Sequence, residues 1–290
     1  MKWKSQITLC HSFSIGRILV VLALQLFFLL APSVTSSQSV EVSISTPREI
    51  EAEFTSVPCK NEDRLAAVKL LFEKVGAPPS EVSIDSYKNV ENLVIRKQGT
   101  SQDKIVIGAH YDKVAEGCGA IDNWTGIVTL AHLYKSLKDI PLNKTLLFVA
   151  FGKEEKGLVG SHSMVAAIRK DEVSQYCEMI NIDSLGLAAP QVADNMSSKK
   201  LTIFIAGLAK EMKVPFSHAS LNNAKSDSNS FLEKGIPALT IHGLTNEWPR
   251  ILHGPNDKAS KINPSGVYLG YRLALALTVR LDESPCSEYR

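Results

Sequence analysis

The sequence lacks the short motifs by which several classes of hydrolase and metalloprotein are recognised. It has no HExxH, which excludes the zinc proteases built on that motif, and no GxSxG, the usual setting of a nucleophilic serine. It has no CxxC pair, which argues against a zinc site made of thiolates. It also has no internal repeat and no low-complexity linker. These absences favour a single catalytic domain whose chemistry depends on other residue types.

Long hydrophobic runs are absent beyond the N-terminus. There, three basic residues precede an apolar run over residues 18–31, which leads into small polar residues. This order is typical of a secretory signal peptide, and we predict that residues 1–36 are a leader cut near Ser37. An uncleaved membrane anchor is the alternative. It is less favoured because Gln25 interrupts the run, which is also shorter than the roughly 20 residues that a spanning helix needs.

An excess of charge of one sign is absent as well. The formal net charge is +2, and removal of Lys2, Lys4 and Arg17 with the leader changes it to −1, because the leader holds no acid. A nearly neutral chain is a poor match for nucleic acid or for an anionic membrane surface. We therefore expect no nucleic-acid partner and no stable membrane association after cleavage. The predicted leader indicates a secreted or periplasmic protein, and we expect it to be a monomer.

Cysteine is scarce but even in number beyond the leader, where Cys59, Cys118, Cys177 and Cys286 remain. In an oxidising compartment four cysteines permit two disulfides, in any of three connectivities. Cys118 lies four residues before Asp122, so a bridge at Cys118 would brace the loop that leads to this aspartate. The alternative is that the four are buried free thiols.

The rest of the chain alternates predicted strands with predicted helices. We predict strands over 82–87, 92–96, 105–108, 145–151, 179–182 and 236–241, and helices over 61–75, 126–137, 201–212, 226–234 and 264–281. This alternation predicts a single-domain α/β fold with a mixed, mostly parallel central sheet and helices on both faces. An extended N-terminal arm without chemistry (37–60), a catalytic domain (61–282) and a C-terminal tail (283–290) complete the expected organisation.

Acids and histidines follow four of the predicted strands. The strand over 105–108 leads to His110 and Asp112, and a glycine-rich loop then leads to Asp122. The other three strands lead to Glu154 and Glu155, to Asp183, and to His253 and Asp257. Because the ligands of an α/β sheet gather beyond the carboxyl ends of its strands, we expect these side chains to meet. Each has an ordinary explanation alone, but together they suffice for two divalent ions that share a carboxylate.

Six segments occur in the order in which the dizinc aminopeptidase family has them: GAHYD, GAIDNWTG, FVAFGKEEKGLVGS, NIDSLG, SDSNSFLEKGIPAL and LHGPNDK. The chain resembles this family from about Asn61 to Leu281. The family includes secreted bacterial leucyl aminopeptidases, and its relatives include glutamate carboxypeptidase, glutaminyl cyclase and transferrin receptor. The resemblance implies the α/β fold of zinc-dependent exopeptidases (phosphorylase/hydrolase-like), peptide substrates and two Zn²⁺ ions.

The resemblance also implies a ligand set. His110 and Asp183 would hold one zinc ion, Glu155 and His253 would hold the other, and Asp122 would bridge the two.

Two further carboxylates receive roles from the resemblance. Glu154 would be the general base that takes a proton from the attacking water and passes it to the leaving amine. Asp112 would fix the tautomer and orientation of the His110 imidazole. In this family the peptide bond after the bridging aspartate, here Asp122–Asn123, is typically cis.

Several positions depart from the family pattern. Trp124 replaces a small residue, and we favour a packing role beneath the pocket over a role at its mouth. Asn223 stands where well-known members have a tyrosine that assists the oxyanion, so this assistance stays open, and Ser228 replaces a common histidine. Four histidines match no ligand position and are expected in helix-face, loop or core roles: His132, His162, His218 and His242.

Together, these features predict a secreted zinc exopeptidase, specifically an aminopeptidase. A carboxypeptidase or a glutaminyl cyclase of the same fold is one alternative, although such cyclases use one zinc and lack the full ligand set. A non-catalytic, receptor-like ectodomain is a second, and it would predict that ligands are lost, whereas none is missing here.

Overall fold

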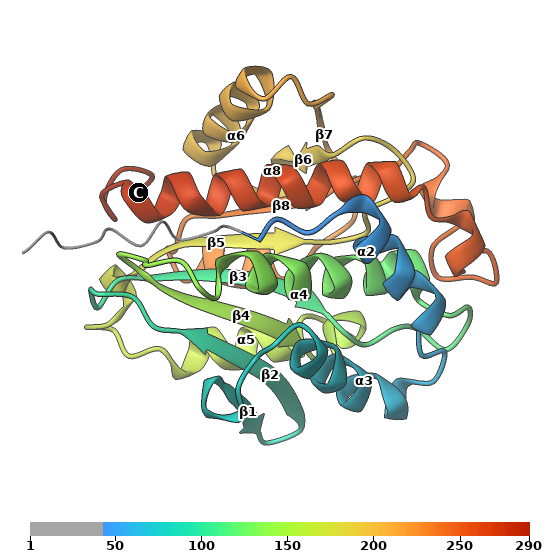
Figure 1. Ribbon diagram of the computed structural model, residues 1–290, viewed down its shortest axis with the longest axis horizontal. Helices are drawn as coiled ribbons and strands as arrows, with labels where there is room; N and C mark the ends of the chain where they lie inside the picture. The colour runs from blue at the N-terminus through green and yellow to red at the C-terminus, as the bar shows by residue number, and fades with distance from the viewer. Residues whose placement is uncertain (1–42) are drawn as a thin grey trace, which may run out of the picture. The chain divides into compact units, whose positions relative to one another are not determined.

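Eight strands form one mixed sheet at the centre of the structure, a computed structural model that describes residues 43–290 (Figure 1). The strands are β1 (Val82–Tyr87), β2 (Val90–Lys97), β3 (Lys104–His110), β4 (Thr145–Phe151), β5 (Tyr176–Ile182), β6 (Gln191–Ala193), β7 (Ser217–Ala219) and β8 (Ala238–His242). Their order across the sheet is β1-β2-β4-β3-β5-β8-β6-β7. The central strands β4, β3, β5 and β8 pair in parallel, as do β6 and β7, and the remaining pairs are antiparallel. The predicted mixed, mostly parallel sheet is confirmed.

Helices cover both faces of this sheet, which confirms the predicted α/β layers (Figure 1). They are α2 (Pro47–Ala52), α3 (Asn61–Lys74), α4 (Thr125–Leu137), α5 (Val159–Ala167), α6 (Lys199–Glu211), α7 (Ser228–Glu233) and α8 (Pro264–Glu283). The core on one face contains side chains from α3, α4, α6 and α8. A smaller core on the other face contains side chains from α5 and α7.

Strand β4 shows how one run of apolar residues supplies both cores. All seven of its residues are buried. Successive side chains of a strand point to opposite faces, so Leu146 and Phe148 enter the larger core, whereas Leu147 and Val149 enter the smaller one. A strand that is buried on both faces is apolar throughout, and this explains why its bounds agree with the prediction.

The N-terminal arm differs from the prediction over its described part. Residues 47–52 are not extended but form helix α2, whose N-cap is a capping box between Thr46 and Glu49 with Pro47 in the first turn. Ile50 and Phe54 are buried in the larger core. The arm is therefore packed onto the domain, and the Thr-x-x-Glu signature was the local signal for it.

Other elements were missed or shifted. Strands β6 and β7 have three residues each and helix α5 carries the sequence VGSHSMVAA, in which glycine and serine weaken the helical pattern. Asn61 does not cap α3, because Lys60 occupies the N-cap and the Asn61 side chain instead bonds to the backbone of Lys113.

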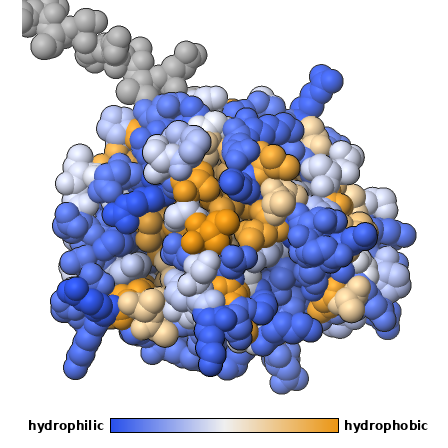
Figure 2. All heavy atoms as spheres, turned by 90° about the horizontal axis from the view of Figure 1, so that it is seen from below, coloured by the Kyte–Doolittle hydropathy of each residue, from blue (hydrophilic) through white to orange (hydrophobic). Residues whose placement is uncertain are grey.

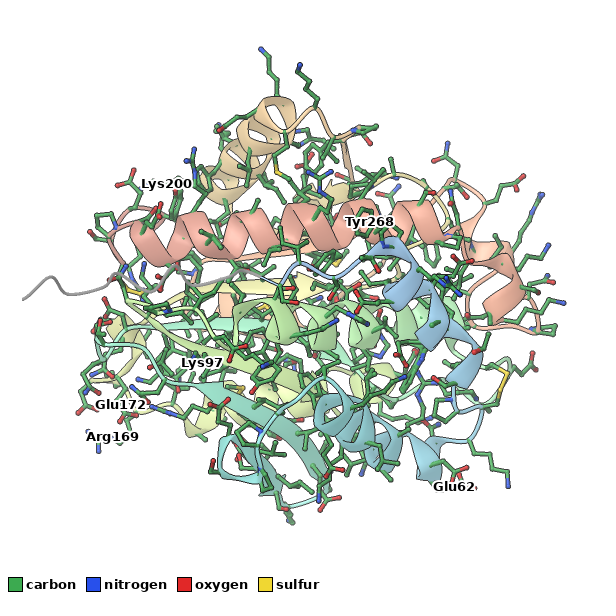
Figure 3. The ribbon with its side chains drawn as sticks, viewed as in Figure 1. Glu62, Lys97, Arg169, Glu172, Lys200 and Tyr268 are labelled. Carbon is green, nitrogen blue, oxygen red and sulfur yellow. A yellow bond between two sulfur atoms is a disulfide. The ribbon has the colours of Figure 1, made fainter. Side chains whose placement is uncertain are left out.

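The four cysteines among the described residues form two disulfides (Figure 3). One disulfide joins Cys59 to Cys118 and the other joins Cys177 to Cys286. The first braces the loop before Asp122, as a bridge at Cys118 was expected to do. The second ties β5 to the residues after α8.

The predicted leader over residues 1–36 lies outside the described residues. Within residues 43–290, no helix has the length and apolar character needed to cross a membrane. Large apolar side chains that are well exposed come from separate places: Ile44, Leu70, Ile84 and Ile203. Figure 2 shows the face near β1 and α3, where apolar residues gather in the middle of a hydrophilic surround.

Candidate metal centre

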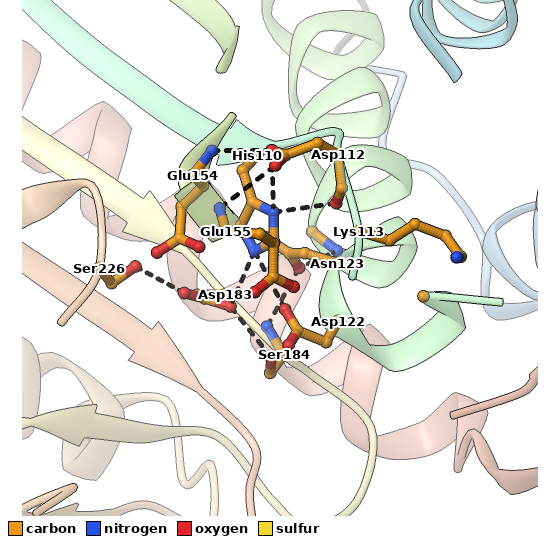
Figure 4. A network of polar contacts seen from close by, with 12 residues as sticks. His110, Asp112, Lys113, Asp122, Asn123, Glu154, Glu155, Asp183, Ser184 and Ser226 are labelled. Carbon is orange, nitrogen blue, oxygen red and sulfur yellow. Dashed lines mark hydrogen bonds and ion pairs between the residues drawn. The ribbon is translucent and has the colours of Figure 1, made fainter. Parts of the chain in front are cut away.

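The acids and histidines that follow the strands come together at one edge of the sheet (Figure 4). His110 is the last residue of β3, and Asp183 directly follows β5. Glu154 and Glu155 open a short 3₁₀ turn after β4, and His253 lies in the loop after β8. Because these four strands are adjacent and parallel, their carboxyl ends deliver all of these side chains to the same place.

The first group of metal-type ligands contains His110, Asp122 and Asp183. The Nε2 atom of His110 lies 3.0 Å from Oδ1 of Asp122 and 3.6 Å from Oδ1 of Asp183. The other oxygen of Asp183 accepts a hydrogen bond of 2.5 Å from the Ser226 hydroxyl, which fixes the direction of the carboxylate.

The second group contains Asp122, Glu155 and His253. The Nε2 atom of His253 lies 3.1 Å from Oδ2 of Asp122 and 3.3 Å from Oε2 of Glu155. In each group the three ligand atoms lie within 4.8 Å of one another. The two oxygens of Asp122 thus face different histidines, which is the arrangement that a carboxylate bridging two ions requires.

The electrostatics of the two groups favour a positive charge between the carboxylates. Hydrogen bonds to Asp122 and Glu155 raise the pKa of His253 to about 10. Burial opposes protonation of His110, but Glu154 and the surrounding aspartates outweigh it and raise its pKa well above the usual value. A divalent cation can take the place of these protons. Zinc is bound by imidazole nitrogens and carboxylate oxygens, and catalytic zinc sites have three protein ligands, the number that each group offers, so the residues fit two zinc ions.

Asp122 is held by contacts that the sequence did not reveal. Its backbone N–H donates to Oδ2 of Asp257 at 3.3 Å, and the N–H of Ile121 donates to Oδ1 of the same carboxylate at 2.6 Å. The Asp122–Asn123 peptide bond is cis, as the resemblance implied. The Asn123 side chain accepts from the N–H groups of Gly126 and Ser184, each at 3.0 Å. Only the position of Asp257 after a strand had drawn attention to it.

Asp112 makes its strongest contacts with the turn that carries the glutamates. Its Oδ1 accepts from the N–H of Glu154 at 2.9 Å and its Oδ2 from the N–H of Glu155 at 3.2 Å. The Nδ1 atom of His110 lies 3.2 Å from the backbone carbonyl of Asp112 and 3.7 Å from its carboxylate. The backbone carbonyl is therefore the nearer partner of the imidazole, and the carboxylate orients the two glutamates.

Glu154 belongs to neither group of ligands, although it lines the same pocket. Burial raises its pKa well above the usual range against the effect of His110, and Asp227 adds to the rise. A carboxylate in such surroundings binds a proton more readily than an exposed one.

The pocket in front of these groups has a volume of about 560 Å³. Much of its wall is apolar and comes from Met196, Leu221, Leu244, Trp248 and Leu252. Among the described residues that line it, Lys225 is the one lysine or arginine, and its side chain is 69% exposed. The carboxylates of the pocket thus face an apolar wall, and Lys225 is the single lysine or arginine among the described lining residues.

A sequence model of the family described as peptidase family M28 matches residues 92–278. The chain belongs to peptidase family M28. Its relatives include aminopeptidase YwaD of Bacillus subtilis (strain 168), 29% identical over 184 residues that cover 61% of this chain and 40% of YwaD. Leucine aminopeptidase 2 of Trichophyton equinum is 25% identical over 236 residues, 71% of this chain and 47% of the relative. The M28 chain therefore spans about half or less of the length of these curated relatives.

Solved structures share the fold of this M28 chain. The zinc aminopeptidase BSAP from Bacillus subtilis superposes with a TM-score of 0.60 at 22% identity, over 69% of this chain and 52% of BSAP. An Acidobacteriales bacterium glutaminyl cyclase gives a TM-score of 0.71 at 17% identity, over 87% of this chain and 99% of the cyclase. At these identities the likeness concerns the fold alone.

The departures from the M28 pattern now have places in the structure. Trp124 is buried and donates from Nε1 to the carbonyl of Glu53 at 3.1 Å, so it packs beneath the site, as favoured. Asn223 lines the pocket. Within residues 43–290, the remaining histidines lie outside both ligand groups: His132, His162, His218 and His242. His132 and His242 are buried, and burial lowers the pKa of each to about 4.

Proposed function

We propose that this chain is a zinc-dependent aminopeptidase that hydrolyses the N-terminal peptide bond of peptides. The observation that carries the proposal is the sharing of Asp122 between two groups of histidine and carboxylate ligands. Membership of family M28 and the aminopeptidase relatives give the reaction class.

His110, Asp122 and Asp183 would hold one zinc ion, and Asp122, Glu155 and His253 would hold the second. Bound there, the two ions supply Lewis acidity, which lowers the pKa of water toward neutrality and polarises the scissile carbonyl. Ser226 and Asp257 assist by fixing the carboxylate of Asp183 and the backbone of Asp122.

Glu154 is the residue that moves protons in this proposal. Its carboxylate takes a proton from the attacking water and delivers it to the nitrogen of the leaving amine. Its neighbour Glu155 cannot do this while it is a ligand. The backbone N–H groups of both glutamates donate hydrogen bonds to the Asp112 carboxylate, and these bonds fix the turn from which the two side chains extend.

The charge distribution of the pocket favours an aminopeptidase over a carboxypeptidase. A carboxypeptidase must bind the terminal carboxylate of its substrate, and arginine is the usual partner for that group. The described lining offers Lys225 at the exposed rim, whereas its floor is rich in carboxylates that attract a terminal ammonium. The apolar wall further favours an N-terminal residue with an uncharged, apolar side chain.

A glutaminyl cyclase and a receptor-like ectodomain have less support. The likeness to a glutaminyl cyclase concerns the fold alone, and His110 completes a ligand set that such cyclases lack. A receptor-like ectodomain predicts lost ligands, whereas all five ligand residues lie together here. Two disulfides support the proposed extracytoplasmic location, because such bonds persist in oxidising compartments.

The test is hydrolysis of aminoacyl anilides by the purified protein, with N-acetylated anilides and N-blocked dipeptides as comparison substrates. We expect activity on free N-termini alone, loss with a chelator, and recovery with Zn²⁺. Glu154→Gln should lower kcat at least about 100-fold, whereas Glu73→Gln, a change of an exposed glutamate on α3, should leave it unaltered. Activity that survives chelation, or that Glu154→Gln retains, refutes the proposal.

A further inference from the structure

Arg64 is a fully buried arginine whose side chain ends on backbone carbonyls. It lies on the first turn of α3 and is 0% exposed, whereas Glu62 on the same turn points into solvent (Figure 3). Its Nη1 donates to the carbonyls of Pro58 and Cys118, each at 2.9 Å, and its Nη2 donates to the carbonyl of Gly119 at 3.1 Å. Its Nε donates to the carbonyl of Tyr111.

Three of these four carbonyls, those of Tyr111, Cys118 and Gly119, lie at the two ends of one loop. Tyr111 opens the loop that follows β3, and Cys118 and Gly119 close it just before Asp122. The guanidinium therefore draws both ends of the loop onto a single fixed group. We call residues 111–122 the metal loop, because Asp112 and Asp122 belong to it.

Two further attachments join the same region of α3 to the metal loop. The Asn61 side chain donates to the carbonyl of Lys113 at 2.7 Å and accepts from its N–H at 2.9 Å. The Cys59–Cys118 disulfide adds a covalent link. Three separate attachments, two made of hydrogen bonds and one a disulfide, thus hold the loop to the start of α3, and all three use residues outside the proposed metal ligands.

Gly119 connects the Arg64 guanidinium to the backbone of Asp122. It has φ +57°, and its carbonyl accepts from both Arg64 Nη2 and the N–H of Trp124, each at 3.1 Å. A Cβ atom at this glycine would lie 2.7 Å from Cβ of Lys113 and 2.8 Å from the carbonyl oxygen of Asp122. The chain is so tight here that a shift of the guanidinium has to shift the bridging aspartate.

The surroundings of Arg64 keep it charged and in place. The guanidinium lies 5.5 Å from the centre of the Trp124 ring, which accounts for a large aromatic residue at this position. Burial lowers its pKa to about 10, and Asp112, Asp122 and Asp257 oppose the fall, so it remains protonated at neutral pH. Its fixed charge offsets part of the repulsion among the site's carboxylates.

We infer that Arg64 is the positioning residue of the metal loop: it fixes the loop's shape, and with it Asp122, before any metal binds. The inference rests on the proposed zinc site. Lysine cannot replace Arg64, because an ammonium on a flexible stem cannot reach carbonyls on several sides at once as the guanidinium fork does.

The test compares Arg64→Lys with Arg272→Lys, the same change at an exposed arginine on α8. Zinc affinity is measured on folded protein by competition with a chelator, beside thermal unfolding and thiol counting. We expect Arg64→Lys to bind at least one zinc ion about 10-fold or more weakly, the usual effect of replacing a residue that orients metal ligands. We also expect a larger fold-change in kcat, which should fall, than in KM. Arg272→Lys should match the wild type. Affinities equal to wild type in folded Arg64→Lys overturn the inference, because a merely structural role lowers stability alone.

A second measurement uses the unaltered protein and decides the matter if Arg64→Lys does not fold. Hydrogen exchange over residues 111–124 is followed with and without zinc. We expect protection to change by less than about threefold, because α3 and not the metal shapes the loop. A loop that exchanges more than about 10-fold faster without zinc overturns the inference. Wild-type protein that binds no zinc but has a protected loop refutes the proposed function instead.

Discussion

Asp122 is the residue on which both halves of the proposed metal centre depend. Its two oxygens contact two histidines that are distant in the sequence, His110 and His253. Every other ligand serves one group only. Replacement of Asp122 and replacement of a ligand that belongs to one group should therefore differ in the number of zinc ions that are lost.

We expect Asp122→Ala to remove both zinc ions and Asp183→Ala to remove one. Metal analysis after dialysis against a zinc buffer measures the content per chain. Asp139→Ala, which alters an exposed aspartate, serves as the control. Equal zinc content in Asp122→Ala and Asp183→Ala would show that the bridge assigned to Asp122 is absent.

Glu178, which lies outside the candidate metal site, makes the free energy of unfolding depend on pH. It lies buried in β5, and neither of its oxygens has a hydrogen-bond partner among the described residues. Burial raises its pKa from 4.5 to about 8, although Lys144 opposes the rise. The folded state thus binds this proton more tightly than the unfolded state. The contribution of Glu178 to stability is full below about pH 4.5 and falls as the pH rises toward 8, because only the unfolded chain then ionises freely at this residue.

Glu178→Gln should remove this dependence. We expect the variant to be more stable than the wild type at pH 8, by on the order of 2 kcal/mol, and to differ little from it at pH 5. Urea unfolding at both pH values measures the two differences. A variant that is destabilised equally at pH 5 and pH 8 would contradict this account of Glu178.

At the scale of elements, the helices and strands that could be predicted from the sequence are those with a long, regular apolar pattern. Strand β4 and helix α8 were placed closely because long apolar patterns specify them. The candidate ligand residues followed from what comes after the strands, and their division into two groups came from the family resemblance. The attachments were not predictable, since Arg64 and Asn61 act through backbone carbonyls that are distant in sequence. A buried arginine has no sequence pattern of its own.

Helix α2 is an element whose packing can be tested directly. Ile50 is fully buried against the larger core, whereas the nearby Ile44 is 54% exposed. We expect Ile50→Ala to lower the free energy of unfolding by about 2–5 kcal/mol, the usual range for a buried isoleucine, and Ile44→Ala to lower it by less than about 0.5 kcal/mol. Chemical denaturation gives both values. Similar losses would mean that α2 does not pack as described.

At the scale of the whole molecule, the two disulfides have separate tasks. Cys177–Cys286 joins the beginning of β5, the end of that strand away from Asp183, to the residues after α8, whereas Cys59–Cys118 attaches the metal loop to the start of α3. Both should stabilise the fold, because each restricts the unfolded chain. Only the second should influence metal binding.

Replacing each pair by serine separates these tasks. We expect a loss of about 2–5 kcal/mol in unfolding free energy for either double variant. Zinc affinity should fall in Cys59→Ser/Cys118→Ser and stay at the wild-type value in Cys177→Ser/Cys286→Ser. The roles are reversed from those proposed if the second variant is the one that loses zinc.

The order of the ligands along the chain has a consequence for synthesis. The first group is complete once Asp183 has been made, whereas the second waits for His253, which follows the central strand β8. On the proposed ligand set, the residues for one zinc ion are present before His253 has been made, whereas the residues for the pair are not. On the proposed function, activity requires His253 and therefore cannot arise before the chain has been made to that residue.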